Sequence, residues 1–168
     1  MLKKIILSSM LLLSSQVYAD NLDKIFDIEL GSKIDETKSN FIRNEKTKNY
    51  AFYKIDFKGF TEVMVSYTPT THKIYDIMTI KKATSDASCE SEAELVAGIL
   101  SKRYGEFKEH KRIVQTAYLI QSENKSLMVD CSGLIDKQIT IYLMDNDLSD
   151  LQKKEELEIE SAKEANNF

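Results

Sequence analysis

The sequence predicts an α+β protein, in which helices pack on one face of an antiparallel sheet. Segments of alternating apolar and polar residues come in two runs of three, and alternation of this kind is typical of half-buried strands. Short turns join the segments within each run, which favours antiparallel neighbours. Segments of helical character flank and separate the two runs. The predicted order of elements is therefore α-βββ-α-βββ-α.

The first half begins with a predicted helix over residues 32–42, because Ser32 and Asp35 have capping-box spacing. Ile34 and Phe41 lie close to one face of that helix. Gly31 ends the short apolar stretch that precedes it. Three strands are then predicted over residues 50–58, 60–67 and 73–81. The last of them carries apolar residues on both faces, which predicts a central position in the sheet.

The second half begins with a helix predicted from Ser91 to Arg103, which Gly105 ends. Its apolar stripe consists of Leu95, Val96, Ile99 and Leu100. A charged link over residues 105–112 leads to three more predicted strands. These strands cover residues 113–121, 126–132 and 137–145. The C-terminal helix, about residues 148–165, has only a sparse apolar stripe, which indicates a partly docked surface helix; a partner-binding helix is the alternative.

The first residues have the pattern of a secretory signal peptide, residues 1–19. Lys3 and Lys4 precede an apolar run from Ile5 to Leu13, and Val17 and Ala19 occupy the positions that a signal peptidase recognises. This run is about half of the roughly 20 apolar residues that a membrane-spanning helix needs. No cysteine follows the predicted cleavage site, so the pattern offers no site for a lipid anchor. We therefore expect a periplasmic, or else a secreted, protein without a stable membrane anchor.

Cleavage would leave residues 20–168 as a single predicted domain. The formal net charge would change from −4 to −6, since two lysines and no acid are removed. An acidic balance argues against nonspecific nucleic-acid binding, which needs a basic face to displace counterions. It also argues against binding to an anionic membrane surface.

Two cysteines, Cys89 and Cys131, survive signal removal. In an oxidising compartment an isolated pair favours a disulfide, which would stabilise the fold by about 4 kcal/mol in the chain-entropy model. The alternative is that Cys89, at the start of a predicted helix, is a nucleophile with a depressed pKa. That alternative needs a nearby base, and nothing in the sequence brings His72 or His110 to Cys89. The disulfide is the favoured prediction.

No catalytic residue, cofactor or metal site is predicted, because the common nucleophile, zinc, phosphate and dinucleotide motifs are absent. Asp145, Asp147, Ser149 and Glu156 have the spacing of an EF-hand calcium loop, but Asp150 replaces the glycine that the loop requires. The acidic start of a helix explains that segment better. Asp130 lies between two apolar residues, yet its outward position on a strand predicts exposure.

A candidate interaction surface lies on the outward-facing sides of the predicted strands. It consists of Phe52, Met64, Tyr142 and Met144. If that face of the sheet is uncovered, these side chains form an exposed apolar patch, and such patches mark protein-binding surfaces. The alternative is that a helix covers the face.

The segment "LGSKIDETKSNF", residues 30–41, resembles the helix start of small bacterial envelope proteins, namely the assembly lipoproteins of the SmpA type and the β-lactamase inhibitor protein. Those proteins place helices on one face of an antiparallel sheet, and the inhibitor has two tandem halves. The chain departs from the lipoproteins in having no lipidated cysteine, and its second half lacks the Gly-Ser start. The resemblance implies a non-catalytic, protein-binding periplasmic module and assigns no functional residue.

These observations together predict a protein that works by binding another protein, as an inhibitor, an immunity factor or an envelope accessory factor. Two alternatives stay open. One is a small hydrolase whose site combines scattered acids with a histidine, and the other is a carrier of a small ligand held between sheet and helices.

Overall fold

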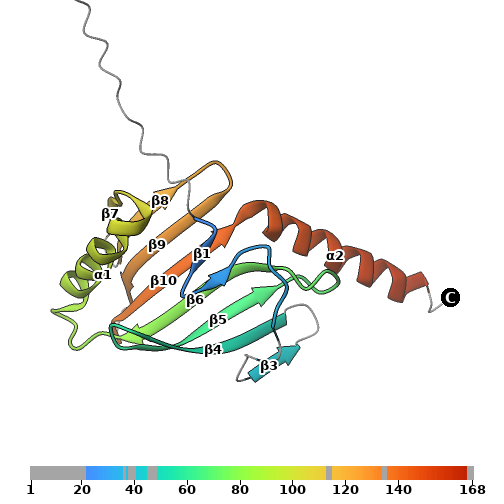
Figure 1. Cartoon of the computed structure of the whole chain (residues 1–168), viewed down its shortest axis with the longest axis horizontal. Helices are drawn as coiled ribbons and strands as arrows, with labels where there is room; N and C mark the ends of the chain where they lie inside the picture. The colour runs from blue at the N-terminus through green and yellow to red at the C-terminus, as the bar shows by residue number, and fades with distance from the viewer. Residues whose placement is uncertain are drawn as a thin grey trace, which may run out of the picture.

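The computed structural model describes residues 22–35, 37, 41–44, 49–112, 115–133 and 136–165. Within this part the chain is α+β, as predicted, and it consists of a large antiparallel sheet, a small two-stranded sheet and two helices (Figure 1). The predicted signal peptide, residues 1–19, lies outside the described residues.

The large sheet has eight strands in the order β3-β4-β5-β6-β10-β9-β8-β7. Their bounds are β3 (Phe41–Asn44), β4 (Asn49–Phe57), β5 (Phe60–Tyr67), β6 (Ile74–Lys82), β7 (Lys108–Arg112), β8 (Gln115–Gln121), β9 (Lys125–Ser132) and β10 (Gln138–Asp145). Strands β3–β6, here the first half, and strands β7–β10, the second half, are each an antiparallel meander. The two meanders join where β6 pairs with β10, so both halves of the chain build one sheet.

The core lies on one face of this sheet, here called the core face. One register row crosses six of the strands there, and its side chains are at most 6 % exposed. That row is Ala51, Val65, Ile77, Leu143, Leu127 and Ile120. Because side chains alternate along a strand, the residues between these positions point to the opposite face, here called the outer face.

Helix α1 (Cys89–Tyr104) follows the first half of the sheet but packs on the second, where it contacts β8, β9 and β10. Its buried side chains are Cys89, Ala93, Val96, Ala97, Leu100 and Tyr104. Of the predicted stripe, Val96 and Leu100 are buried and Ile99 is half-buried, whereas Leu95 is 62 % exposed and was wrongly included. Ala93 and Ala97, which are small and one turn apart, face the sheet instead and allow the helix to approach closely.

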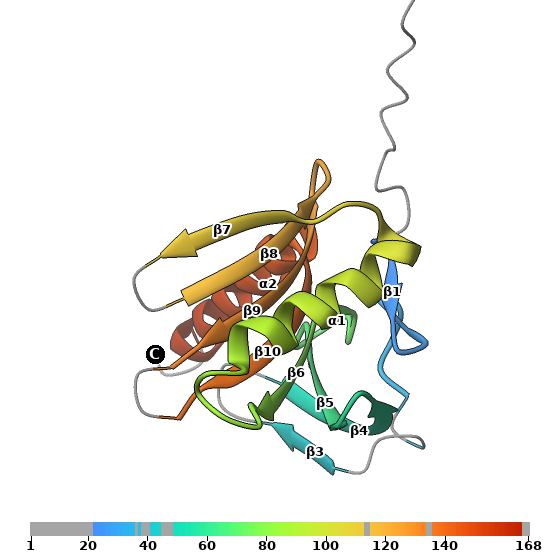
Figure 2. The same cartoon turned by 90° about the vertical axis from the view of Figure 1, so that its left-hand side faces the viewer.

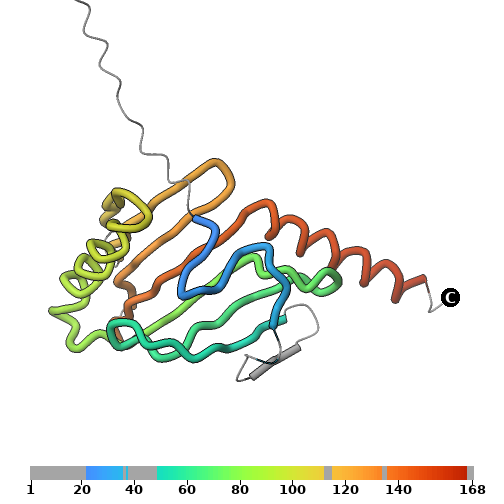
Figure 3. The backbone as a smooth tube through the Cα atoms, in the orientation of Figure 1, coloured from blue at the N-terminus to red at the C-terminus, as the bar shows by residue number. Residues whose placement is uncertain are grey.

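Helix α2 (Asn146–Ala165) follows β10 directly and contacts β6. Seen from the side in Figure 2, α1 lies in front of the strands and α2 behind them. The backbone trace shows α2 extending past the end of the sheet (Figure 3). All described side chains after Ile159 are exposed, so only the first part of α2 is docked.

The prediction of a helix over residues 32–42 was wrong. Strands β1 (Lys24–Ile25) and β2 (Ile28–Glu29) form a short hairpin, and the chain then runs beside the start of β6. Gly31 N–H donates to the Ile74 carbonyl at 2.8 Å, and the Ile74 N–H donates to the Ser32 carbonyl at 2.9 Å. These long-range hydrogen bonds replace helical ones, and the Ser32 hydroxyl donates to the Glu29 carbonyl at 2.6 Å instead of capping a helix.

The predicted order with three helices and two runs of three strands was therefore wrong. Besides the missing first helix, residues predicted as a charged link form β7, an edge strand paired with β8. An edge strand needs backbone partners on one side only, and its charged side chains stay in solvent. A charged link in solvent and a charged edge strand thus have the same composition, so composition did not distinguish the two.

Candidate functional site

A continuous row of large apolar side chains crosses the outer face of the sheet. The register pairs Phe52 with Met64, Met64 with Met78, Met78 with Tyr142, Tyr142 with Met128, and Met128 with Leu119. These six residues are here called the outer row. They come from six neighbouring strands, three in each half of the chain, so the row exists only because the two meanders form one sheet.

Every member of the outer row is half-buried, so each side chain keeps part of its surface in solvent. Ile80 lies two residues beyond Met78 on the same face of β6 and is 46 % exposed. Among the described residues, only two other large apolar side chains are exposed to this degree, and both are on helices. The outer face therefore holds a continuous arrangement of partly exposed apolar side chains across six strands.

The structure places the four predicted surface residues on this face but not in one row. Phe52, Met64 and Tyr142 belong to the outer row, whereas Met144 lies two residues further along β10, opposite Asp76. The Tyr142 hydroxyl donates to the Met144 sulfur at 3.2 Å and approaches Asp76 Oδ2 at 3.5 Å. Met78, Met128 and Leu119 were not predicted as surface residues, although strand alternation could have indicated their outward position.

Burial controls the acid–base chemistry of this end of the outer face. It raises the pKa of the Tyr142 phenol, and the nearby carboxylate of Asp76 adds to the effect. Burial, followed by the charge of Asp76, raises the pKa of Tyr75 to about 12. Both phenols are therefore neutral hydrogen-bonding groups at neutral pH, and neither is prepared to act as a base.

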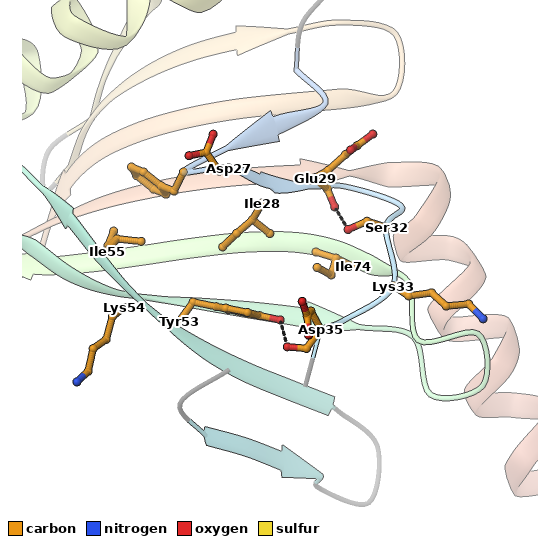
Figure 4. A pocket seen from close by; sticks show the side chains of 11 residues that line it. Asp27, Ile28, Glu29, Ser32, Lys33, Asp35, Tyr53, Lys54, Ile55 and Ile74 are labelled. Carbon is orange, nitrogen blue, oxygen red and sulfur yellow. Dashed lines mark hydrogen bonds between the residues drawn. The ribbon is translucent and has the colours of Figure 1, made fainter. Parts of the chain in front are cut away.

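A pocket of about 490 Å³ lies on the other side of the sheet, where the β1–β2 hairpin covers the first half. Its lining comes from the hairpin, the chain that follows it, β4 and β6 (Figure 4). The residues are Phe26, Asp27, Ile28, Glu29, Ser32, Lys33, Asp35, Tyr53, Lys54, Ile55 and Ile74. Helix α1 contributes no residue to this lining, because it packs mainly on β8–β10.

The acids of this pocket do not form a catalytic pair. Asp27 and Glu29 are exposed and project from the hairpin away from Ile28, whereas Asp35 lies across the pocket beside Tyr53 (Figure 4). Asp35 Oδ1 accepts hydrogen bonds from the backbone and hydroxyl of Thr37 at 3.1 and 2.6 Å, so it orders its own turn. The described part of the chain also holds no group of three histidine, cysteine or acidic side chains that could bind a metal ion.

Cys89 and Cys131 form the predicted disulfide, which joins the first residue of α1 to β9. Both side chains are buried, at 0 % and 1 % exposure. Cys89 is therefore half of a structural bridge and not a nucleophile. His72 and His110 are exposed, in the turn before β6 and on the edge strand β7.

The segment with calcium-loop spacing is not a loop. Asp145 ends β10 and caps α2, since its carboxylate accepts the Leu148 N–H at 3.1 Å. Asp147 and Glu156 belong to the helix itself. The acidic start of a helix is thus the correct interpretation of this segment.

The predicted exposure of Asp130 was wrong, because this residue is only 6 % exposed. Its carboxylate accepts hydrogen bonds from Gln115 Nε2 at 2.9 Å and from the Ser132 hydroxyl at 3.3 Å. An outward direction on a strand does not imply exposure when long side chains of the neighbouring strands lie across the face.

No family model matches this chain, and no curated protein or solved structure matches it either. The resemblance of residues 30–41 to the small envelope proteins therefore stays a prediction. The described part of the chain contains no helix that combines the length and the apolar character needed to span a bilayer.

Proposed function

We propose that this protein is a non-catalytic binding module, exported by residues 1–19, that recognises another protein through the outer row. Its role is that of an inhibitor, an immunity factor or an envelope accessory factor. The observation that carries the proposal is the unbroken register of Phe52, Met64, Met78, Tyr142, Met128 and Leu119 across six strands.

The chemistry of the outer row supports protein recognition. Three of its six side chains are methionines, which are unbranched and polarizable and adapt to differently shaped partners. The two aromatic members supply large, rigid contact area, and aromatic residues are enriched at the centres of interfaces. A strand-supported row holds these groups in a fixed order, which limits the entropy that binding costs.

Binding through the outer row is tested by a capture experiment with matched variants. The double variant Met64→Lys/Met128→Lys places one charge on each half of the row, and Leu95→Lys/Leu157→Lys places two on exposed helical positions. Proteins captured from envelope extract by the wild type and the control should be reduced about tenfold or more with the row variant. Equal capture by all three proteins, or no reproducible capture, would refute the proposal.

Export is tested separately. N-terminal sequencing of the chain recovered from a periplasmic fraction should begin at Asp20. Recovery of the uncleaved chain from the cytoplasm would contradict this part of the proposal. Size-exclusion chromatography of the same material should give a monomer, and a dimer that the row variant dissociates would show that a second copy covers the face.

A further inference from the structure

We propose that the pocket beneath the β1–β2 hairpin binds a small, uncharged molecule with an apolar body and one hydrogen-bonding group. The ligand would lie between Ile28, Ile55 and Ile74, with its polar group beside the Tyr53 hydroxyl. This inference is independent of the outer row, which is on the other face of the sheet.

The interior of the pocket is apolar. Ile28 points in from the hairpin, and Ile55, Ile74 and the ring of Tyr53 face it from the strands (Figure 4). Ile74 is only 2 % exposed and therefore forms a floor rather than a rim. A volume of about 490 Å³ falls within the range of roughly 300–1,000 Å³ that small-molecule sites occupy.

The wall that the hairpin forms is held by contacts on both sides. Leu22 and Ile25 are each 2 % exposed, and the Tyr104 hydroxyl donates to the Lys24 carbonyl at 2.7 Å. The hairpin is thereby bound to the end of α1. Ile28 follows directly on the hairpin turn, so its position over the pocket is set before any ligand arrives.

The hairpin turn stores strain. Phe26 and Asp27 both have positive φ, 53° and 61°, where an Asn-Gly pair is the usual choice. A non-glycine residue in this conformation is strained and persists where the surroundings fix it. Here the Phe26 ring packs on Phe57 with centroids 5.3 Å apart. Strain of this kind clusters at ligand sites, and in this protein it shapes one wall of the pocket.

The charge distribution favours an uncharged ligand. Lys33 and Lys54 extend away from the cavity, as do Asp27 and Glu29 from the hairpin above it (Figure 4). Asp35 also lines the pocket, but its Oδ1 accepts the two hydrogen bonds from Thr37 and orders its own turn. A charged ligand would lose its hydration, which is costly in an apolar site. The polar end is instead a neutral phenol: burial raises the pKa of Tyr53, and its hydroxyl donates a long hydrogen bond, 3.4 Å, to the Asp35 carbonyl.

The test uses the neutral fluorescent dye N-phenyl-1-naphthylamine on the full chain. The dye should bind saturably, and 4-phenylbutan-1-ol should displace it. The alcohol should compete about tenfold better than 4-phenylbutyrate or 4-phenylbutylamine, which share its body and carry a charge. A dye that does not saturate, or equal competition by all three compounds, overturns the proposal.

Two variants test whether the dye binds in this pocket. Ile28→Trp fills the cavity and should weaken dye binding about tenfold or more, whereas Leu95→Trp adds the same indole on exposed helix α1 and should not. Circular dichroism confirms that each variant is folded, and Ile55→Phe replaces Ile28→Trp if that variant is not. Unchanged dye binding in a folded, filled variant refutes the site.

A third variant tests the polar end. Tyr53→Phe keeps the ring, so dye affinity should stay within about twofold, while the affinity for 4-phenylbutan-1-ol should fall about threefold to tenfold. Tyr118→Phe, a matched change on β8 in the other half, should alter neither value. If the affinities for the dye and for the alcohol fell equally, Tyr53 would be merely structural and its assigned role would be overturned.

Discussion

The two halves of the sheet have the same strand pattern but are covered in different ways. The second half, β7–β10, lies under a 16-residue helix that a buried disulfide fixes to β9. The first half, β3–β6, lies under a hairpin whose strands have two residues each. The helix-covered half has a core in which Leu127, Val129 and Leu143 are fully buried, whereas the hairpin-covered half holds the 490 Å³ pocket.

The difference arises from where the helices go. Each meander is followed by a helix, but α1 packs on the other meander and α2 leaves the sheet after contacting β6. No helix is then left for the core face of β4, so the N-terminal segment must cover it. A short hairpin cannot fill the space that a helix with its side chains fills, about 10 Å across. Closure by a helix gives stability, and closure by a hairpin leaves room for a ligand.

The largest expected effect is loss of the disulfide. The double variant Cys89→Ala/Cys131→Ala should lower the free energy of unfolding by about 4 kcal/mol, because the unfolded chain regains the freedom of a long loop. Urea denaturation of oxidised wild type and variant measures it. A loss below about 1 kcal/mol would show that α1 is held by its apolar contacts alone.

Next in size is a pair of truncations, one in each half. Leu127→Ala in the core of the helix-covered half should cost about 3 kcal/mol, since Leu127 is fully buried and its truncation leaves a cavity. Ile55→Ala should cost about 1 kcal/mol, because Ile55 is half-buried and already borders a pocket. Equal losses on denaturation would contradict the contrast between the two halves.

A smaller effect is expected where α2 is docked. Glu155 is 4 % exposed, and its carboxylate accepts the Thr70 N–H at 2.7 Å and the Thr71 hydroxyl at 2.8 Å. Burial alone would raise its pKa, but these hydrogen bonds outweigh burial and lower it. Glu155→Gln should cost about 2 kcal/mol near pH 7, and Glu158→Gln, exposed on the same helix, about zero.

The pH dependence of this docking follows from the lowered pKa. The ionised carboxylate of Glu155 stabilises the folded chain above its ordinary pKa of 4.5, and the contribution is lost as the pH falls through the lower folded value. The difference in stability between wild type and Glu155→Gln should therefore shrink below about pH 4.5. A difference that is constant from pH 7 to pH 3 would exclude the charge as its cause.

The smallest effect concerns the first turn of α1. Glu92 accepts hydrogen bonds from the Ser88 hydroxyl at 2.8 Å, the Thr84 N–H at 2.9 Å and Lys81 Nζ at 3.0 Å. Burial opposes ionisation, but these donors lower the pKa of Glu92 to about 2. Glu92→Gln should cost about 1 kcal/mol at pH 7, after allowance for partial exposure.

The Glu92 contribution should fade between about pH 4.5 and pH 2, since the folded pKa lies below the unfolded one. Glu90→Gln is the control, because Glu90 is exposed in the same helical turn. Thermal unfolding at pH 7 and pH 3 measures the stability of both variants. A larger loss of stability for Glu90→Gln than for Glu92→Gln would contradict the role assigned to Glu92.

Sequence patterns predicted the long strands well and the short segments poorly. In β4, β5 and β10, alternation placed Ala51, Val65 and Ile141 on the core face, where they are buried. Ser32 and Asp35 predicted a helix that does not form, because both residues serve turns and the chain between them pairs with β6. A capping pattern is a weak local preference, and a few long-range hydrogen bonds override it.

The candidate sites were predictable to different degrees. Phe52, Met64 and Tyr142 could be placed on one face because alternation determines the direction of a side chain. That Met78 lies between Met64 and Tyr142 depends on β6 pairing with β10, which no local pattern indicates. The pocket combines Ile28, Tyr53 and Ile74 from three separate segments, so nothing in any one of them predicted it.

By itself, the sequence determined the α+β class, the directions of side chains along the long strands and the pairing of Cys89 with Cys131. The class and the side-chain directions depend on local periodicity, and the disulfide pairing follows because the chain has only two cysteines. Only the tertiary structure decided that both meanders share one sheet, that α1 covers the second half, and that a hairpin covers the first. Those outcomes depend on contacts between residues far apart in the chain, whose energies emerge only when the whole core is assembled.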